Sequence, residues 1–373
     1  MKIRSNKDLS ATEFGYPLFI YFFVRFLNNF SVCNELLNRM ENRVLAKRMG
    51  KVNIESPIYV TGFARAGSTI LLEMLNSHRD LTSHRYFQIG SSSTPYFMNR
   101  FIEKVPLMTE FSERVHNDRI RVNRDSPEGL EEIYWQNYFE NILDENEPDI
   151  LDEAINNDEF ERFYSNQMRK LIISQEGNRY VAKNNYVITR IDYVRKMFPK
   201  SKFIIMVRNP INHIASLIKQ DILIKRLEMQ DPRLVDWESM VGHREFGIAK
   251  KCINVGNNVS EIRSLWKKED SYVLGWARYW REIYQYIHEK SKKTKDLLLV
   301  RYEDLCEKSA VTIDGIFDYL AINDYSAIKK RYADILEKPK YYNISFSDDE
   351  MEFIINETGS VADKYGYDIN ESR

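Results

Sequence analysis

One short stretch, VTGFARAGSTILLEML at residues 60–75, combines small, hydroxyl-bearing and basic residues directly after an apolar run. The residues that could surround an anion there are Gly62, Ala66, Gly67, Ser68 and Thr69. Backbone N–H groups at the start of a helix bind anions, and glycines let the backbone approach the ligand closely. Arg65, between the glycines, adds a guanidinium whose donors match phosphate or sulfate oxygens. The stretch therefore predicts a site for a phosphate- or sulfate-bearing ligand.

The stretch differs from an ATP-binding loop at one place. In the pattern G-x-x-x-x-G-K-[ST], a lysine follows the second glycine and reaches the β- and γ-phosphates, whereas Ser68 stands there in this chain. The difference disfavours transfer of a γ-phosphoryl group with Mg²⁺. A P-loop phosphotransferase that uses ATP and Mg²⁺ stays open as an alternative function.

Two more apolar runs end in residues that bind anions. The run KFIIMV is followed by Arg208, and Ser216 lies eight positions later (216 − 208) in a predicted helix. The run LLLV is followed by Arg301 and Tyr302. Because ligands of parallel sheets collect at the carboxyl ends of the strands, we expect these residues to lie close to the first loop.

The elements that must position these residues follow from apolar runs that alternate with helical patterns. The predicted strands are residues 58–60, Arg179–Ala182, Lys202–Val207 and Leu297–Val300. Strands alternating with helices predict an α/β fold, a P-loop-type parallel sheet flanked by helices. We expect one domain over residues 1–373, with a helical N-terminal extension (1–50) and a mostly helical insertion (90–175) on the acceptor side.

Four segments, in this order and together, resemble the sulfotransferases that use 3′-phosphoadenylyl sulfate (PAPS). The resemblance is to the bacterial carbohydrate and small-molecule type, related to the tyrosylprotein and carbohydrate sulfotransferases. PIYVTGFARAGSTILLEMLNSH is similar to their arginine-bearing 5′-phosphosulfate loop, and FIIMVRNPINHIASL to their 3′-phosphate motif. LLLVRYEDLCEKSAVTIDGIFDYLAI resembles a later strand and helix. KNNYVITRIDYVRKMFPKSKF resembles a segment that opens with a lysine, here Lys183, which precedes Arg208 by 25 residues (208 − 183).

The resemblance implies a role for each of these residues. Those expected to bind PAPS are Gly62, Arg65, Ala66, Gly67, Ser68, Thr69, Arg208, Ser216, Arg301 and Tyr302. The first loop would hold the 5′-phosphosulfate, and Arg208 with Ser216 the 3′-phosphate. Arg65 and Lys183 would stabilise the charge on the leaving oxygen as 3′,5′-ADP is released. PAPS has no γ-phosphoryl group, which accounts for the missing P-loop lysine, and no metal ion is expected.

A sulfotransferase also needs a general base to deprotonate the acceptor hydroxyl. The segment SHRDLTSHRYFQ lacks the glutamate of the tyrosine-sulfating pattern but places His84 near that position. His84 is our first candidate because histidine titrates near neutral pH; a packed structural histidine is the alternative. Asp125, Glu131 and Glu132 are reserve candidates. The acceptor is expected to be a saccharide or a small hydroxylated molecule.

Charge and cysteine content exclude several classes of protein. The net charge of −1 gives no general attraction to nucleic acid. The three cysteines (Cys33, Cys252 and Cys306) form no C-x-x-C pair, so we expect neither a disulfide framework nor a zinc site. A reducing, cytoplasmic location follows from this, and the polar, mixed-charge residues 1–15 predict no signal peptide.

The segment Tyr16–Val32, YPLFIYFFVRFLNNFSV, is apolar but contains one arginine and two adjacent asparagines. It is shorter than the roughly 20 apolar residues that span a bilayer. Our first interpretation is a helix packed in the core, and our second a helix lying at the inner face of the membrane. A non-catalytic interaction protein that uses this segment to reach lipid is the remaining alternative. The joint presence of Arg65, Lys183, Arg208 and Ser216 argues against it.

Overall fold

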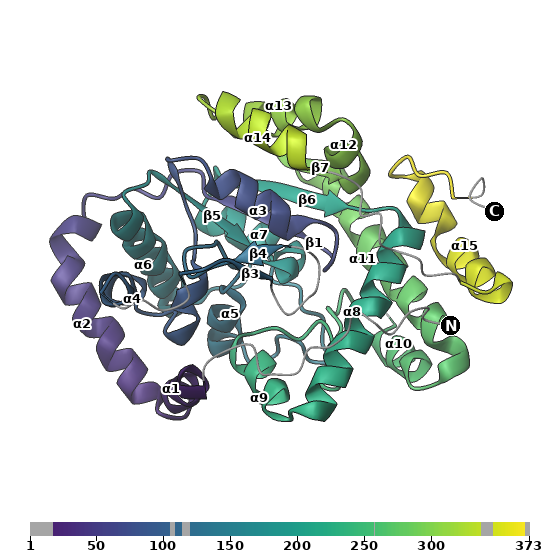
Figure 1. The fold of residues 1–373 in the computed structure, drawn as a ribbon, viewed down its shortest axis with the longest axis horizontal. Coiled ribbons are helices and arrows are strands. Elements are labelled where there is room, and N and C mark those ends of the chain that lie inside the picture. Colours follow the sequence, from purple (N-terminus) through teal and green to yellow (C-terminus); the bar gives the residue numbers. More distant parts are fainter. Residues whose placement is uncertain (1–17, 105–108, 114–119, 257, 337–345, 370–373) are drawn as a thin grey trace.

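The centre of the molecule is a five-stranded parallel sheet. The computed structural model describes residues 18–104, 109–113, 120–256, 258–336 and 346–369. The strands are β1 (Ile58–Gly62), β2 (Leu81–Thr82), β5 (Arg179–Lys183), β6 (Lys202–Val207) and β7 (Leu297–Arg301). They lie in the order β2–β5–β1–β6–β7, and all neighbouring strands are parallel (Figure 1).

This sheet confirms the predicted α/β fold class. The predicted strands Arg179–Ala182, Lys202–Val207 and Leu297–Val300 coincide with β5, β6 and β7 to within one residue. β2 was not predicted, because two residues are too few to show a period. Successive side chains of a strand point to opposite faces of the sheet. Accordingly, Phe203 and Ile204 of β6 enter two different hydrophobic cores.

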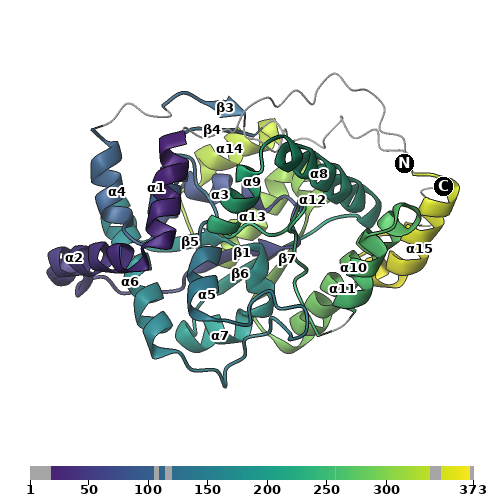
Figure 2. The ribbon, with the colours of Figure 1, turned by 90° about the horizontal axis from the view of Figure 1, so that it is seen from below.

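Helices cover both faces of the sheet (Figures 1 and 2). One face packs against α3 (Ser68–Asn76), α13 (Ser309–Leu320) and α14 (Ser326–Ile335), with α12 (Tyr302–Glu307) following β7. The helices of the other core are α5 (Glu132–Tyr138), α6 (Asp158–Gln175), α7 (Ile191–Met197), α8 (Pro210–Gln230), α10 (Val259–Trp266), α11 (Tyr272–Lys293) and α15 (Asp348–Asp363). The sheet is thus held between two helical layers.

The described part of the inserted segment 90–175 contains the helices α4 (Pro95–Ile102), α5 and α6. The described chain between them is irregular except for a small antiparallel pair, β3 (Ser112–Glu113) with β4 (Arg121–Val122), which was not predicted. Short 3₁₀ helices connect other elements: η1 (Tyr86–Gly90), η2 (Asn185–Thr189) and η3 (Glu269–Ser271).

The N-terminal extension is helical over its described part. It consists of α1 (Leu18–Asn29) and α2 (Ser31–Met49), which lie at one edge of the molecule (Figure 1). α1 packs against α9 (Arg233–Met240) and η1. The start of the predicted apolar segment, residues 16 and 17, lies outside the described residues. No helix in the described ranges has both the length and the apolar character needed to cross a bilayer.

Candidate active site

The carboxyl ends of β1 and β6 mark the natural binding crevice of this sheet. The two strands are paired along their length, up to Gly62 opposite Met206. The chain leaving β1 continues to β2 on one side, whereas the chain leaving β6 continues to β7 on the other. Such a reversal of direction is where open α/β sheets bind ligands. The two basic loops predicted from the sequence therefore meet at this point.

The loop between β1 and α3 is closely packed and requires its glycines. Gly62 and Gly67 have φ angles of 132° and 97°. A Cβ atom at Gly62 would lie 2.7 Å from the carbonyl oxygen of Met206, and one at Gly67 would lie 2.5 Å from the ring of Tyr302. Ser68 is the first residue of α3. The first backbone N–H groups of a helix have no partner within the helix, and together with the helix dipole they favour an anion at this end.

Two arginines, one from each loop, are brought into direct contact. Arg208 is 5% exposed and donates from Nη1 to the carbonyl oxygen of Arg65 at 2.8 Å. Its guanidinium lies 4.7 Å from the centre of the Tyr302 ring. Arg65 Nε donates to Ser216 Oγ, which is 3.5 Å away on α8. The structure thus gathers Arg65, Arg208, Ser216 and Tyr302 around the glycine loop.

The buried ring of His213 is hydrogen-bonded to the β1–α3 loop and lies within range of the charges of Arg65 and Arg208. Burial, and then the charges of Arg208 and Arg65, lower the pKa of His213 to about 3. The ring is therefore neutral, with Nε2 donating to the carbonyl oxygen of Ala64 at 2.7 Å and Nδ1 accepting from Trp280 at 3.2 Å. Burial is the main cause of the low pKa, and the charges of Arg208 and Arg65 add to it because both guanidinium groups lie within range of the ring.

Lys183 ends β5, next to β1, and lies against the segment that precedes α5. A Cβ atom at Gly129 would lie 3.0 Å from Lys183 Cδ and 2.5 Å from its carbonyl oxygen, so glycine leaves room for the lysine. That segment is anchored by Glu132, which forms a two-pronged, buried ion pair with Arg190 at 2.7 and 2.8 Å. Asn184 also donates to Glu132, at 3.0 Å.

A histidine–glutamate pair that the sequence analysis did not identify lies within range of the charge of Lys183. His243 follows α9, and its Nδ1 is 3.7 Å from Glu245 Oε2. Glu245 is held by Asn185, which donates to it at 2.8 Å. His243 Nε2 has no hydrogen-bond partner among the residues that the structure describes, and the side chain is 30% exposed. The pair therefore leaves one imidazole nitrogen available to a ligand.

Charge controls the protonation of this pair. Desolvation lowers the pKa of His243, but its pairing with Glu245 and the charges of Glu245 and Glu238 outweigh this and raise the pKa overall. Desolvation raises the pKa of Glu245, yet His243, Lys183 and Asn185 together lower it well below its usual range. Glu245 is therefore ionised and favours the protonated imidazole of His243.

His84, our first candidate for the base, has no ring nitrogen available. It is 2% exposed, and its two nitrogens lie 3.1 Å from Gln88 Oε1 and 3.3 Å from the Tyr134 hydroxyl. Burial lowers the pKa of His84 to about 4. The ring is a satisfied, neutral core group, which corresponds to the structural alternative.

The reserve carboxylates are also engaged elsewhere. Glu131 is buried and accepts hydrogen bonds from Tyr164 and Tyr180. Glu132 forms the ion pair with Arg190 described above. Asp125 lies 3.4 Å from Arg85 on the surface. None of these three shows the electrostatic influence of Lys183 that His243 and Glu245 show.

Arg301 lies at the carboxyl end of β7 but turns away from the glycine loop. Its guanidinium lies 4.2 Å from the centre of the Tyr367 ring, and its Nε is 3.7 Å from Asp304. The adjacent residue, Tyr302, covers Gly67 and Arg208 instead. Of the two residues predicted at this strand end, the structure therefore brings only Tyr302 to the cluster.

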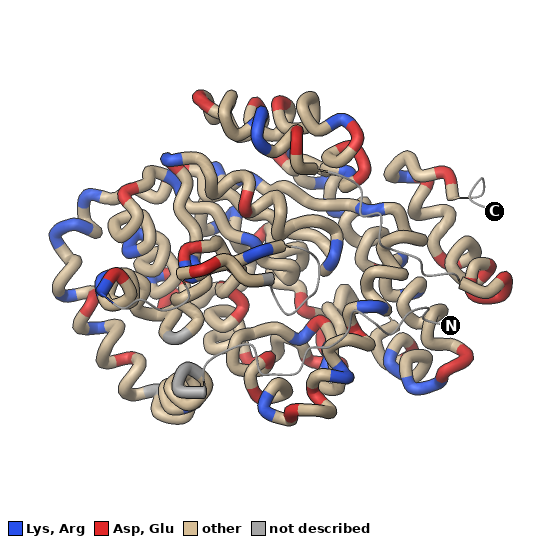
Figure 3. Tube along the Cα trace, in the orientation of Figure 1, with Lys and Arg blue, Asp and Glu red and all other residues tan. Residues whose placement is uncertain are grey.

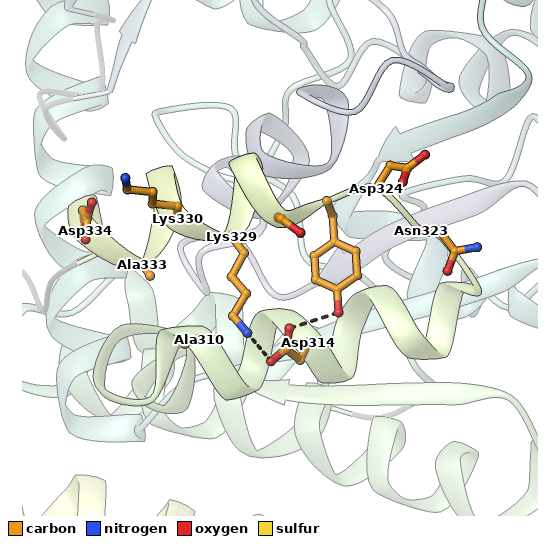
Figure 4. Close-up of a pocket in the computed structure, with 10 residues that line it drawn as sticks. Ala310, Asp314, Asn323, Asp324, Lys329, Lys330, Ala333 and Asp334 are labelled. Carbon is orange, nitrogen blue, oxygen red and sulfur yellow. Dashed lines mark hydrogen bonds and ion pairs between the residues drawn. The ribbon is translucent and has the colours of Figure 1, made fainter.

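A groove of about 540 Å³ between α13 and α14 is separate from this cluster (Figure 4). Its lining includes Asp314, which accepts from Tyr325 at 3.0 Å and pairs with Lys329. None of the predicted site residues lines it. Because the groove lies away from the carboxyl ends of β1 and β6 and contains none of the predicted site residues, we do not take it as the candidate active site.

The fold of the chain is similar to that of solved structures. The chain resembles the crystal structure of sulfotransferase STF9 from Mycobacterium avium, with a TM-score of 0.52 and 12% identity, over 88% of this chain and 81% of that one. It also resembles sulfotransferase STF1 from Mycobacterium tuberculosis H37Rv, with a TM-score of 0.51 and 11% identity, over 94% and 89% of the two chains. At such low identity these matches show the fold alone. No match was found among curated protein sequences.

The sequence itself matches a family model described as the sulfotransferase family. The match covers residues 57–244, which are 188 of the 373 residues (244 − 57 + 1). It includes the glycine loop, Lys183, both loop arginines and His243. The chain, with its parallel sheet and its basic crevice at the ends of β1 and β6, therefore belongs to the sulfotransferase family, whose chemistry is sulfuryl transfer.

Proposed function

We propose that this sulfotransferase moves a sulfuryl group from PAPS to a hydroxyl group of a saccharide or another small molecule and releases 3′,5′-ADP. The observation that carries the proposal is the contact between Arg208 and Arg65, which joins two anion-binding loops at one crevice. PAPS is a donor with two separate anionic ends, a 5′-phosphosulfate and a 3′-phosphate. Two loops of this kind match that ligand better than a single phosphate cradle does.

The residues of the crevice fit such a donor. The α3 N-terminus, with Ser68 and Thr69, would hold the 5′-phosphate, and Arg208 with Ser216 the 3′-phosphate. The space at Gly67 is bounded by the Tyr302 ring rather than by charged groups. The positive charges of Arg65 and Arg208, which lie at the crevice, would favour both anionic ends.

PAPS, when bound, supplies a sulfuryl group attached to a phosphate that is a good leaving group. Arg65 and Lys183 lie at the adjacent ends of β1 and β5 and would stabilise negative charge that develops there. Donors held in place before the reaction are worth roughly 3–4 kcal/mol each in the transition state. Neither residue has to move a proton in this role.

We assign the general base to His243, with Glu245 as its positioning residue. The free Nε2 would accept the proton of the acceptor hydroxyl, while Glu245 stabilises the imidazolium that results. Lys183 lies close enough for its charge to act on both groups. Base and leaving-group stabiliser are therefore neighbours, as a single displacement at sulfur requires.

A transfer assay tests this proposal. Wild-type protein is incubated with PAPS labelled in the sulfuryl group and a panel of saccharides and phenols, beside ATP labelled in the γ-phosphoryl group with Mg²⁺. We expect label from PAPS alone to reach an acceptor, and Lys183→Ala to lower the rate by about 10²–10³-fold. Lys202→Ala, at the opposite end of β6 and paired with Asp296, is the matched control and should keep the rate.

Two results would contradict the proposal. Transfer of label from ATP but not from PAPS would indicate a phosphotransferase. A Lys183→Ala variant that is as fast as Lys202→Ala would remove Lys183 from the chemistry.

A further inference from the structure

Helix α2 packs against the rest of the protein with its polar side. Asn38 accepts hydrogen bonds from Gln167 at 3.1 Å and from Lys170 at 2.6 Å, both on α6. Glu41 forms an ion pair with Lys170 at 2.9 Å, and both side chains are 0% exposed. Glu41 also accepts from the backbone N–H of Phe97 at 2.7 Å. A surface helix normally packs its apolar stripe against the protein and exposes its polar face. Helix α2 instead packs these polar residues against the protein.

The outward side of α2 carries the apolar residues. Val32, Leu36, Met40 and Val44 follow one another at intervals of four residues, and each is more than half exposed. Residues at this spacing lie on one face of a helix. No described residue covers this stripe. Exposed apolar patches of this kind mark interaction sites on protein surfaces.

Helix α1 extends the same kind of surface. It buries Tyr21, Val24 and Leu27, yet leaves four phenylalanines exposed in and just after the helix. These exposed residues are Phe22, Phe23, Phe26 and Phe30, with exposed fractions between 44% and 60%. We call these residues, together with Val32, Leu36, Met40 and Val44, the α1–α2 apolar face.

Basic residues lie among the apolar ones. The exposed charged residues of α2 are Glu35, Arg39, Arg43, Lys47 and Arg48, four basic and one acidic. Glu35 pairs with Arg39, whereas Arg43 and Lys47 have no partner among the described residues. Figure 3 shows these basic positions along α2 at one edge of the molecule.

We propose that the α1–α2 apolar face docks on the surface of an anionic lipid bilayer. Exposed phenylalanines would enter the boundary between headgroups and acyl chains, while Arg43 and Lys47 meet the negative headgroups. A second copy of this chain fits less well, because pairing the face with itself would bring these unpaired cations together. In this proposal α1 and α2 lie along the membrane surface.

The docked face is connected to the acceptor side of the crevice. Tyr21 and Val24 of α1 share a small hydrophobic core with Leu130, Trp237 and Val241. Val241 is two residues before His243 (243 − 241). A membrane-bound α1 would therefore hold the chain around His243 near the lipid surface. The docking itself does not depend on the proposed function.

Vesicle flotation of the full chain tests the proposal. Wild-type protein is floated with vesicles of phosphatidylcholine alone and of phosphatidylcholine mixed equally with phosphatidylglycerol. We expect binding to the mixed vesicles that falls at high salt. Arg43→Glu/Lys47→Glu should weaken this binding by at least roughly tenfold, and Phe22→Ser/Phe26→Ser should abolish it. Thermal melts check that these exposed substitutions leave the fold intact.

The controls lie on other helices, away from the α1–α2 apolar face. Lys267→Glu/Lys268→Glu reverses two exposed charges just after α10, and Val311→Ser removes an exposed apolar side chain of α13. Both should float like the wild type. Wild-type protein that stays unbound, or charge-reversed protein that floats as well as the controls, would overturn the proposal. So would a dimer in sedimentation that Phe22→Ser/Phe26→Ser dissociates, with no vesicle binding.

Discussion

At the scale of single residues, the proton-accepting group decides how the rate depends on pH. His243 must be neutral to accept a proton, and its pKa is raised above the usual value mainly by Glu245. Glu245→Gln removes that negative charge and should lower the pKa of His243. The acidic limb of the kcat/KM profile should therefore lie above pH 6.5 in the wild type and move to lower pH in the variant.

His84→Asn serves as the comparison for this prediction. His84 is buried between Gln88 and Tyr134, so its loss should lower the melting temperature and leave the acidic limb unchanged. His243→Asn should instead leave the melting temperature nearly unchanged and lower kcat by about 10²–10⁴-fold. The opposite pattern for the two histidines would return His84 to the role of base.

Sequence reasoning succeeded where a residue belongs to a contiguous motif. Arg65, Arg208 and Ser216 stand at strand ends and in a helix start that the sequence makes visible, and the structure brings them together. The sequence did not point to His243, our proposed base, because the segment VGHREFG has no motif and comes within range of the charge of Lys183 only through the fold. His84 was preferred because of its position in the chain, which does not reveal that its ring is buried.

At the scale of elements, the β1–α3 loop depends on backbone conformations that only glycine adopts easily. Gly67→Ala places a Cβ against the Tyr302 ring at a φ of 97°. The left-handed conformation alone costs an L residue about 1–2 kcal/mol. We expect weaker donor binding together with a lower melting temperature, measured by calorimetry and thermal unfolding.

Gly315→Ala is the matched control for that loop. Gly315 lies inside α13, and a Cβ there meets nothing within 4 Å. Alanine is favoured over glycine in a helix by about 1 kcal/mol, so this variant should be slightly more stable and bind the donor as the wild type does. Equal donor binding by both variants would contradict a close approach of ligand to the loop.

At the scale of elements, the contact between α2 and α6 also depends on the buried ion pair between Glu41 and Lys170, which places polar residues of α2 on its packed side. Lys170→Met would leave Glu41 buried without its partner, a change that typically costs about 3–5 kcal/mol. Glu41→Gln/Lys170→Met should recover much of that loss in a denaturant titration. If the single variant were as stable as the wild type, the polar side of α2 would not be its packed side.

The α1–α2 region also shows why amphipathic patterns are ambiguous without a fold. The sequence predicted helices there, and the described part confirms them. It did not reveal that the polar residues of α2 pack inward against Lys170 and Gln167 on α6. Periodicity identifies the two faces of a helix, but only the packed partner decides which face is covered.

At the scale of the whole molecule, the sheet determines where the proposed donor-binding residues lie relative to the proposed base. The loops that we propose to bind the donor follow β1 and β6, while Lys183 ends β5, next to β1. The strand order therefore places Lys183 near the β1–α3 loop, and the chain after α9 brings the proposed base, His243, and Glu245 within range of the charge of Lys183. This arrangement follows from the strand order. The sequence predicted a parallel α/β sheet but not the order of its strands.

The most direct test of the account is calorimetric binding of 3′,5′-ADP, beside ATP with Mg²⁺, to the wild type, Arg208→Ala and Arg301→Ala. We predict that the wild type binds 3′,5′-ADP more tightly than ATP–Mg²⁺. Loss of charge-assisted hydrogen bonds in Arg208→Ala should weaken this binding by about 10–100-fold, whereas Arg301→Ala, which faces Tyr367, should have a smaller effect. No binding of 3′,5′-ADP by the wild type, or equal effects of the two substitutions, would contradict a donor site built on Arg65, Arg208 and Ser216.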